Sequence, residues 1–207
     1  MNLPNALSAG RIVVTPLVAV LPMFNSWPLR LTAFLLFLVA AITDYIDGYL
    51  ARSRHEITDL GKMLDPLADK MLLVGTFVPM FLLAKTLPFQ TPFGDIGLPL
   101  WIVIVVLGRE LFMTVFRQFA KQRGVVIAAI SSAKWKTGFQ LIWQGSAYFW
   151  FWAVTAAIKH DVQNDSLWKG FALFNGTVGL VTMIIAVFLT IYSLAIYMRS
   201  FSSVLVK

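Results

Sequence analysis

The sequence contains no cysteine, only two histidines and few charged residues, since Asp, Glu, Lys and Arg make up 13% of its 207 positions. Without cysteine the chain has no disulfide, no zinc–thiolate site and no thiol nucleophile. It also lacks any segment typical of a nucleic-acid-binding module, so no nucleic-acid partner is expected. Catalytic chemistry in this chain must therefore come from oxygen and nitrogen groups.

Hydrophobic residues, by contrast, make up 58% of the chain. Apolar runs of about 20 residues, the length that crosses a bilayer, recur along the whole sequence with short polar gaps between them. This pattern predicts a single membrane domain over residues 1–207, an all-α bundle of six transmembrane helices with a short N-terminal interfacial segment at residues 5–10. The expected crossings are residues 12–24, 29–51, 61–84, 98–119, 135–158 and 170–198.

Basic residues fall mainly on one side of this topology, the side that holds both termini and the loops after the second and fourth crossings. Because basic loops stay in the cytoplasm, we expect both termini on the cytoplasmic side of the membrane. Eleven basic residues lie on that side (Arg11, Arg52, Arg54, Lys62, Arg117, Lys121, Arg123, Lys134, Lys136, Arg199 and Lys207), against four on the other (Arg30, Lys85, Lys159 and Lys169).

Carboxylates occur where they are most costly. The chain has ten acidic residues, and five of them fall inside or at the mouth of expected membrane helices: Asp44, Asp47, Asp65, Asp69 and Glu110. An aspartate at the centre of a bilayer costs about 2.5–3.5 kcal/mol, so something must compensate them. Asp44 and Asp47 share one helix face, and Asp65 and Asp69 share another. A short connection makes the two helices an antiparallel pair, which brings all four aspartates to the cytoplasmic end.

Four oxygen donors at one depth suit Mg²⁺ or Mn²⁺, and two divalent ions would cancel the four negative charges. Two other interpretations remain open from the spacing alone. In the first, the acids are structural elements paired with basic side chains. In the second, they form the ion path of a cation transporter.

The residues around the aspartates form a longer pattern. Asp44-Tyr-Ile-Asp47-Gly48-Tyr-Leu-Ala51-Arg52 is followed, after eight residues, by Gly61-Lys-Met-Leu-Asp65-Pro-Leu-Ala-Asp69. This string resembles the signature of the CDP-alcohol phosphotransferase family, D-x-x-D-G-x-x-A-R followed by G-x-x-x-D-x-x-x-D, at every fixed position. The six-helix pattern and the opening stretch from Asn2 to Arg11 extend the resemblance over most of the chain.

The resemblance implies transfer of a substituted phosphate from a CDP-linked lipid to an alcohol, with release of CMP. Two metal ions would stabilise the charge that develops on both sides of an in-line displacement. The family pattern makes Asp44, Asp47 and Asp65 metal ligands and makes Asp69 the general base, which also touches a metal. By the same resemblance, the positions expected to contact the CDP-lipid are Asn5, Gly48, Ala51, Arg52, Thr58 and Gly61.

Basic residues later in the chain predict the acceptor. Arg109 and Arg117 lie in the fourth expected crossing, and Lys134 and Lys136 open the fifth, so together they could surround an anionic acceptor such as a sugar-alcohol phosphate. Two alternatives remain open: Arg109 could have a structural partner in Glu110 or the aspartates, and the two lysines could only anchor the helix end at the lipid headgroups. The stretches around Arg109 and Lys134 are similar to those of the branch that uses CDP-diacylglycerol and glycerol 3-phosphate, although members often have glycine where this chain has Ala133. Inositol phosphate, serine and phosphatidylglycerol are the alternative acceptors within the family.

The resemblance also implies a place in the cell and partners. The expected location is the bacterial cytoplasmic membrane, with the active site facing the cytoplasm and the lipid tails entering sideways from the bilayer. The spacing of small residues, and not the resemblance, predicts a homodimer through faces such as the one that holds Gly176 and Gly179.

Overall fold

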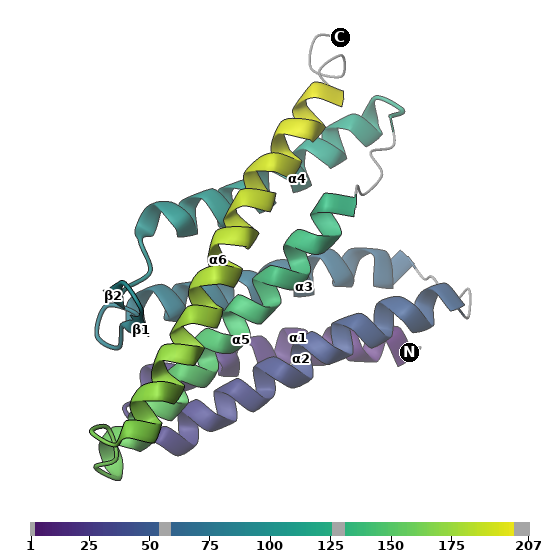
Figure 1. Ribbon diagram of the computed structural model, residues 1–207. Coiled ribbons are helices and arrows are strands. Elements are labelled where there is room, and N and C mark those ends of the chain that lie inside the picture. Colours follow the sequence, from purple (N-terminus) through teal and green to yellow (C-terminus); the bar gives the residue numbers. More distant parts are fainter. Residues whose placement is uncertain (1–2, 54–58, 126–130, 201–207) are drawn as a thin grey trace.

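The computed structural model describes residues 3–53, 59–125 and 131–200, and within this part the fold is a bundle of long α-helices with one small β-hairpin (Figure 1). In chain order the elements are α1 (Leu3–Val20), the 3₁₀ turn η1 (Leu21–Met23), α2 (Trp27–Ser53), α3 (Asp59–Leu83), β1 (Phe89–Thr91), β2 (Gly94–Ile96), α4 (Leu100–Gln122), α5 (Ser131–Lys159) and α6 (Ser166–Ser200). The prediction of an all-α architecture is confirmed.

The N-terminal segment belongs to the first helix. Helix α1 runs without a break from Leu3 to Val20 and includes residues 5–10. The position of this segment at the membrane interface stays a prediction. The apolar stretch from Asn5 to Met23 is long enough to cross a membrane as one unit. The gap expected between the first two crossings is found at residues 24–26, which connect η1 to α2.

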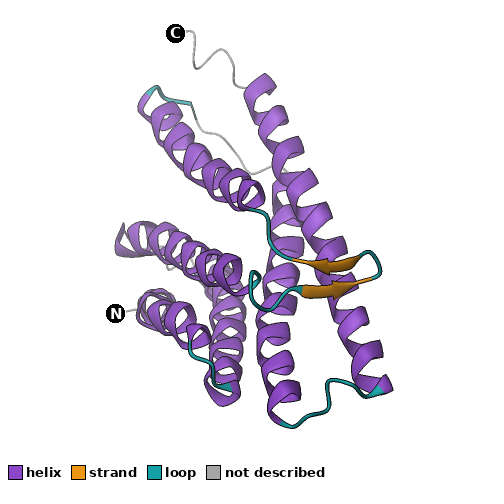
Figure 2. Ribbon diagram, turned by 90° about the vertical axis from the view of Figure 1, so that its left-hand side faces the viewer, coloured by secondary structure: helices purple, strands orange, loops and turns teal. Residues whose placement is uncertain are grey.

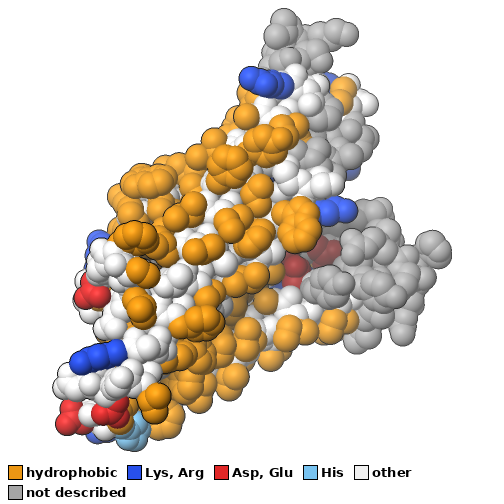
Figure 3. All heavy atoms as spheres, in the orientation of Figure 1, with side chains coloured by type: hydrophobic (Ala, Val, Ile, Leu, Met, Phe, Trp, Pro, Cys, Tyr) orange, Lys and Arg blue, Asp and Glu red, His pale blue; other side chains and the backbone are white. Residues whose placement is uncertain are grey.

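Four stretches in the described helices are long and apolar enough to cross a membrane: Asn5–Met23, Trp27–Asp44, Leu64–Leu83 and Ser166–Ser200. The two other helices, α4 and α5, have 23 and 29 residues and therefore the necessary length, but they carry more polar side chains. The count of six crossings thus stays a prediction for those two. Figure 3 shows a broad hydrophobic face, with charged side chains gathered mainly toward its ends, as expected of an integral membrane protein.

Helices α1, α2 and α3 lie side by side, while α5 and α6 pack together and cross them at an angle (Figure 1). Close approach of α1 and α3 depends on Gly75, since a β-carbon there would lie 2.8 Å from a methyl group of Thr15. Tyr148 of α5 is fully buried against both helices, and its hydroxyl donates to the carbonyl oxygens of Val18 and Gly75 at 3.2 and 3.3 Å. One side chain of α5 thus connects the two halves of the bundle.

The hairpin was not predicted, because residues 85–97 lie in the gap between the third and fourth expected crossings, where only a connecting turn was expected. Its strands pair antiparallel with Gln90 opposite Asp95, and Gly94 adopts a φ of 101°, which suits glycine in a tight connection (Figure 2). Strand β1 packs on α6, and the indole of Trp150 in α5 donates to the carbonyl oxygen of Pro88 at 3.1 Å.

The small residues of α6 serve this packing and not a dimer. A β-carbon at Gly176 would collide with the carbonyl oxygen of Gln90, and one at Gly179 would come within 3.2 Å of Ser146 Oγ. Both glycines are buried inside the chain. The prediction that this face mediates a homodimer is therefore wrong, because the hairpin and α5 of the same chain already cover it.

Candidate active site

Three helices meet at the aspartates. Ser8 of α1 donates from its hydroxyl to Oδ1 of Asp65 at 2.5 Å. One turn further along, Arg11 donates from Nη1 to Oδ1 of Asp69 at 2.9 Å and also to Oδ1 of Asp44. Because Ser8 and Arg11 lie on one face of α1, that helix reaches the carboxylates of both α2 and α3.

Burial differs sharply within this group. The Arg11 side chain is 2% exposed, whereas those of Asp44 and Asp69 are 42% and 52% exposed. The cation therefore lies on the protein side of the carboxylates, and their remaining oxygens face outward. With three carboxylates and one guanidinium, the described part of the cluster keeps two negative charges, which favours binding of cations.

A second cluster of opposite sign surrounds Glu110, whose side chain is 14% exposed. Its Oε2 accepts from Lys70 Nζ at 2.9 Å, and its Oε1 accepts from Arg109 Nη1 at 2.7 Å and from Lys136 Nζ. Arg109 also donates from Nη2 to Ser193 Oγ at 3.1 Å. Three cations from α3, α4 and α5 thus converge on one carboxylate, which leaves two positive charges for an anion.

Both clusters line one cavity of about 140 Å³. Asp44 and Asp69 form its acidic wall, and Lys70 and Lys136 form its basic wall together with Glu110. The charge of the lining side chains changes from negative to positive between Asp69 and Lys70, which are neighbours in α3. The cavity can therefore hold a ligand or a ligand pair that presents cations to one wall and a phosphate to the other.

Several predicted site residues lie outside the described side chains or at the edge of the cluster. Helix α2 includes Asp47, Gly48, Ala51 and Arg52, but the surroundings of these residues fall outside the part that the structure describes. Thr58 lies outside the described residues altogether. Asn5 is 5% exposed on α1, one turn before Ser8, and Gly61 is buried near the start of α3. These contacts to a CDP-lipid stay predictions.

The four basic residues predicted for the acceptor do not all meet. Arg109 and Lys136 converge on Glu110, as described above. Arg117 instead donates from Nη2 to the hydroxyl of Tyr197 at 3.1 Å, and its guanidinium lies 5.5 Å from that ring. Lys134 is exposed, and of these four residues only Lys136 lines the cavity.

Sequence reasoning did not assign site roles to Ser8, Arg11 or Lys70. The first two follow Asn5 at steps of three residues, so all three lie on one face of α1, a spacing that could have flagged them. Lys70 follows Asp69 directly inside an apolar stretch, where a lysine needs a partner. Glu110 stands out from the sequence as a costly membrane acid, but nothing there shows that it gathers three cations.

The donor atoms at the acidic wall fit Mg²⁺ or Mn²⁺, because they are carboxylate oxygens with outward-facing lone pairs. Among the side chains that the structure describes, no group of three or more Asp, Glu, His or Cys residues is gathered closely enough to hold one ion. Asp47, the remaining predicted ligand, is outside that set. Asp44, Asp65 and Asp69 would therefore have to draw together, or be joined by Asp47, to complete a site.

Comparison with known proteins identifies the family. The family profile described as CDP-alcohol phosphatidyltransferase matches residues 1–198. A CDP-diacylglycerol–glycerol-3-phosphate 3-phosphatidyltransferase of Arabidopsis thaliana is 31% identical over 215 residues, which is 100% of this chain and 65% of that protein. One of Bacillus subtilis is 31% identical over 204 residues, 93% of this chain and 91% of that protein.

A third relative has a different name. The cardiolipin synthase (CMP-forming) of Oryza sativa subsp. japonica is 31% identical over 214 residues, 100% of this chain and 59% of that protein. The chain thus spans less than two thirds of the length of the two plant relatives and nearly all of the bacterial one. Because the profile covers almost the whole sequence, the chain belongs to the CDP-alcohol phosphatidyltransferase family.

Proposed function

We propose that this protein transfers the phosphatidyl group of CDP-diacylglycerol to glycerol 3-phosphate, giving phosphatidylglycerol phosphate and CMP. This is the reaction of a phosphatidylglycerophosphate synthase, and the relatives from Arabidopsis and Bacillus carry names for it. The observation that carries the proposal is the single cavity with an acidic wall on one side and a basic wall on the other. The acidic wall suits a metal-bound diphosphate, and the basic wall suits the phosphate of the acceptor.

The family is generally metal-dependent, and the acidic wall is the place for the ions in this chain. We propose that two Mg²⁺ or Mn²⁺ ions are held by Asp44, Asp47, Asp65 and Asp69. When bound, they would neutralise charge on the diphosphate oxygens and on the departing CMP. Ser8 and Arg11 have a positioning role, because each donates to an aspartate oxygen and so fixes the direction in which that carboxylate points.

The chain's own groups complete the reaction. A hydroxyl oxygen of the acceptor forms a bond to the phosphorus of the phosphatidyl group, and the bond from that phosphorus to the CMP oxygen breaks. Asp69 takes the hydroxyl proton, and CMP leaves with the bonding electron pair. Asp69 suits this role because it lies on the cavity beside Lys70, and Lys70 would hold the acceptor phosphate close to the base.

The basic cluster favours a phosphate monoester such as glycerol 3-phosphate over serine and phosphatidylglycerol. Inositol phosphate is also a phosphate monoester, so the names of the relatives, and not the charge of the cluster, favour glycerol 3-phosphate over it. Lys70, Arg109 and Lys136 outnumber Glu110, so the cluster can accept the two negative charges of a phosphate monoester. Serine carries no phosphate, and the headgroup of phosphatidylglycerol carries one negative charge. The latter is the acceptor of a cardiolipin synthase, and the rice relative makes that reaction the second candidate.

The test is CMP release by the purified full-length protein with CDP-diacylglycerol and Mg²⁺. Glycerol 3-phosphate, inositol phosphate, serine and phosphatidylglycerol are compared as acceptors. We expect release only with glycerol 3-phosphate, and a loss of about 10²- to 10⁴-fold in Asp69→Asn. Release with phosphatidylglycerol alone would favour the second candidate. If no acceptor supports CMP release and the protein conducts cations in vesicles, a transporter would be favoured.

Matched variants on α5 test the acceptor site. Lys136 is buried on the cavity, whereas Lys134, two residues earlier, is exposed away from it. Lys136→Gln is expected to raise the KM for glycerol 3-phosphate at least ten-fold, and Lys134→Gln is expected to raise it much less. Equal effects of the two changes would support the four-cation site predicted from the sequence and contradict the cavity geometry.

We further propose that the protein lies in the bacterial cytoplasmic membrane with both termini and the active site toward the cytoplasm. Because the chain has no cysteine, single introduced cysteines report the topology directly. In intact cells, a membrane-impermeant thiol reagent should label Lys169→Cys and not Lys121→Cys. The reverse pattern would overturn the orientation. A homodimer stays a prediction, and its interface must avoid the covered face of α6 described above.

A further inference from the structure

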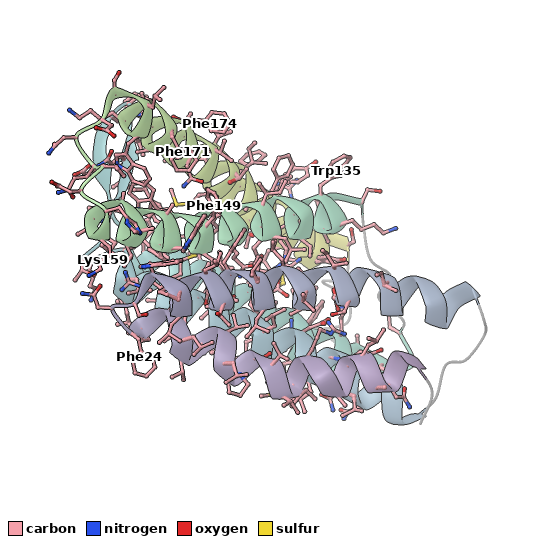
Figure 4. The ribbon with its side chains drawn as sticks, turned by 90° about the horizontal axis from the view of Figure 1, so that it is seen from below. Phe24, Trp135, Phe149, Lys159, Phe171 and Phe174 are labelled. Atoms are coloured by element: carbon pink, nitrogen blue, oxygen red, sulfur yellow. The ribbon has the colours of Figure 1, made fainter. Side chains whose placement is uncertain are left out.

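A second and larger cavity lies at the opposite end of the bundle. Its volume is about 800 Å³. Figure 4 shows Lys159 at the same end of the molecule as Phe24, with Trp135 at the other end of α5. The lining residues that matter here are Trp27, Arg30, Leu83, Leu87, Thr155 and Lys159.

This cavity is separate from the candidate active site. Arg30 and Asp44 lie in the same helix, α2, fourteen positions apart in the sequence. At 1.5 Å per residue this separation is about 21 Å. The residues that line the two cavities do not overlap. Neither the family signature nor the proposed reaction gives this end of the bundle a role.

Arg30 is the unusual residue of this cavity, because its guanidinium is buried without an acidic partner among the residues that the structure describes. The residue is 5% exposed. Its Nε donates to the carbonyl oxygen of Pro22 at 3.0 Å, and its Nη1 donates to Thr155 Oγ1. The ion pairs formed by the described acidic residues all involve other cations. A guanidinium has five N–H donors, so most of its capacity remains for a ligand in the cavity.

The other residues that line this cavity favour a ligand with an anionic group attached to a hydrophobic part. Lys159 adds a second positive charge, and Ser26 and Trp27 bring the N-terminal end of α2, which has a positive dipole. Leu83, Leu87 and further apolar side chains supply the hydrophobic sides. Among the residues that line this cavity, none is acidic.

We propose that this cavity binds the phosphate group of a phospholipid, with Arg30 and Lys159 on the phosphate oxygens and the apolar walls along the start of the acyl chains. Phosphate suits the site because its oxygens accept several N–H donors of one guanidinium at once. Bound phosphate supplies the counter-charge that the described acidic residues do not give to Arg30. A lipid held there connects α2, α3 and α5, the elements from which the lining residues come.

Native mass spectrometry of the full-length protein in a phosphate-free maltoside detergent tests the proposal. Phosphatidylglycerol is titrated into wild type, Arg30→Gln and Lys136→Gln, where the last variant removes a cation from the other cavity. We expect Arg30→Gln to weaken one saturable lipid site by about 10- to 100-fold, the effect of losing a charge-assisted hydrogen-bonded pair. Lys136→Gln should leave that site unchanged.

Competition with inorganic phosphate distinguishes the two sources of the phosphate group. Displacement of the lipid shows a site that also accepts free phosphate, and no displacement shows a site specific for lipid. If Arg30→Gln does not yield folded protein, Arg30→Lys and Lys159→Gln replace it, and each should weaken the site about ten-fold or less. Lipid binding that is equal in wild type and the Arg30 and Lys159 variants, or that is lost only in Lys136→Gln, would overturn the proposal.

Discussion

Replacing Glu110 with glutamine removes the one negative charge from a cluster of three cations. Arg109 and Lys136 have side chains that are each 5% exposed, whereas Lys70 is 33% exposed. Water can screen Lys70, so its pairing contributes little to stability. The two buried cations have no such screening, and they lose the partner that offsets their desolvation.

Removing one partner of a buried ion pair costs about 3–5 kcal/mol. The amide oxygen of glutamine still accepts a hydrogen bond, so the lower end, about 3 kcal/mol, applies here. For a chain of this size, 1 kcal/mol corresponds to about 2–4 °C in melting temperature. Glu110→Gln should therefore melt about 6–12 °C below wild type. Lys136→Gln should lower the melting temperature less, since it removes a buried charge and leaves Glu110 with two partners.

The assay is thermal unfolding of the detergent-solubilised protein, followed as a double-mutant cycle. In Glu110→Gln/Lys136→Gln, two neutral amides face each other, so the loss should be smaller than the sum of the single losses. The coupling energy expected for such a pair is about 1.5–3 kcal/mol. Additive losses, or a Glu110→Gln protein that melts within about 2 °C of wild type, would refute the idea that this carboxylate holds the basic cluster together.

Two further predictions concern other parts of the molecule. Arg11→Gln should destabilise the protein by about 2–4 kcal/mol in EDTA and by clearly less in excess Mg²⁺, because divalent ions at Asp44 and Asp69 replace the missing positive charge. Thermal unfolding in the two solutions measures this, and an equal loss of stability in both would contradict it. Gly176→Ala should cost about 1–3 kcal/mol, since its β-carbon would meet Gln90, whereas Gly170→Ala meets nothing within 4 Å and should melt like wild type. Similar melting of the two alanine variants would show that the hairpin does not pack as described.

The aspartates could be found from the sequence because charged residues are rare inside apolar membrane helices. Carboxylates are costly inside apolar helices, so Asp44, Asp65 and Asp69 stand out in the amino-acid sequence alone. Their spacing along helices then places each pair on one face. The helical architecture was predictable for a similar reason, since the length and composition of the apolar runs reflect the thickness of the bilayer.

The partners of these residues could not be found in the same way. Whether Arg11 faces Asp44 or water depends on how α1 packs against α2 and α3, and hydrophobic periodicity does not specify the rotation of one apolar helix against another. In lipid, small residues and polar contacts decide that rotation. The 2.8 Å contact that a side chain at Gly75 would make with Thr15 is one such determinant. It joins residues of two different helices, so no local sequence pattern reveals it.

The hairpin escaped prediction because its stabilising contacts come from distant parts of the chain. Its strands have three residues each, too short to show an alternating pattern. The hairpin is held by Trp150, which donates to the carbonyl oxygen of Pro88 directly before β1, and by the close fit of Gln90 to Gly176, which lies 86 positions later in the sequence. The same long-range contact explains why the spacing of Gly176 and Gly179 wrongly suggested a dimer interface.

The two charged clusters have the same arrangement of charges. Each contains a single residue of the opposite sign at its centre, Arg11 among the aspartates and Glu110 among the cations. These central charges allow the helices to pack before any ligand arrives, because neither cluster then has to bear its full self-repulsion. They leave each cluster with two charges in excess, enough to favour metal on one side of the cavity and a phosphate monoester on the other. Neutralising either central residue should therefore affect folding of the ligand-free protein more than folding of the protein with metal and substrate bound.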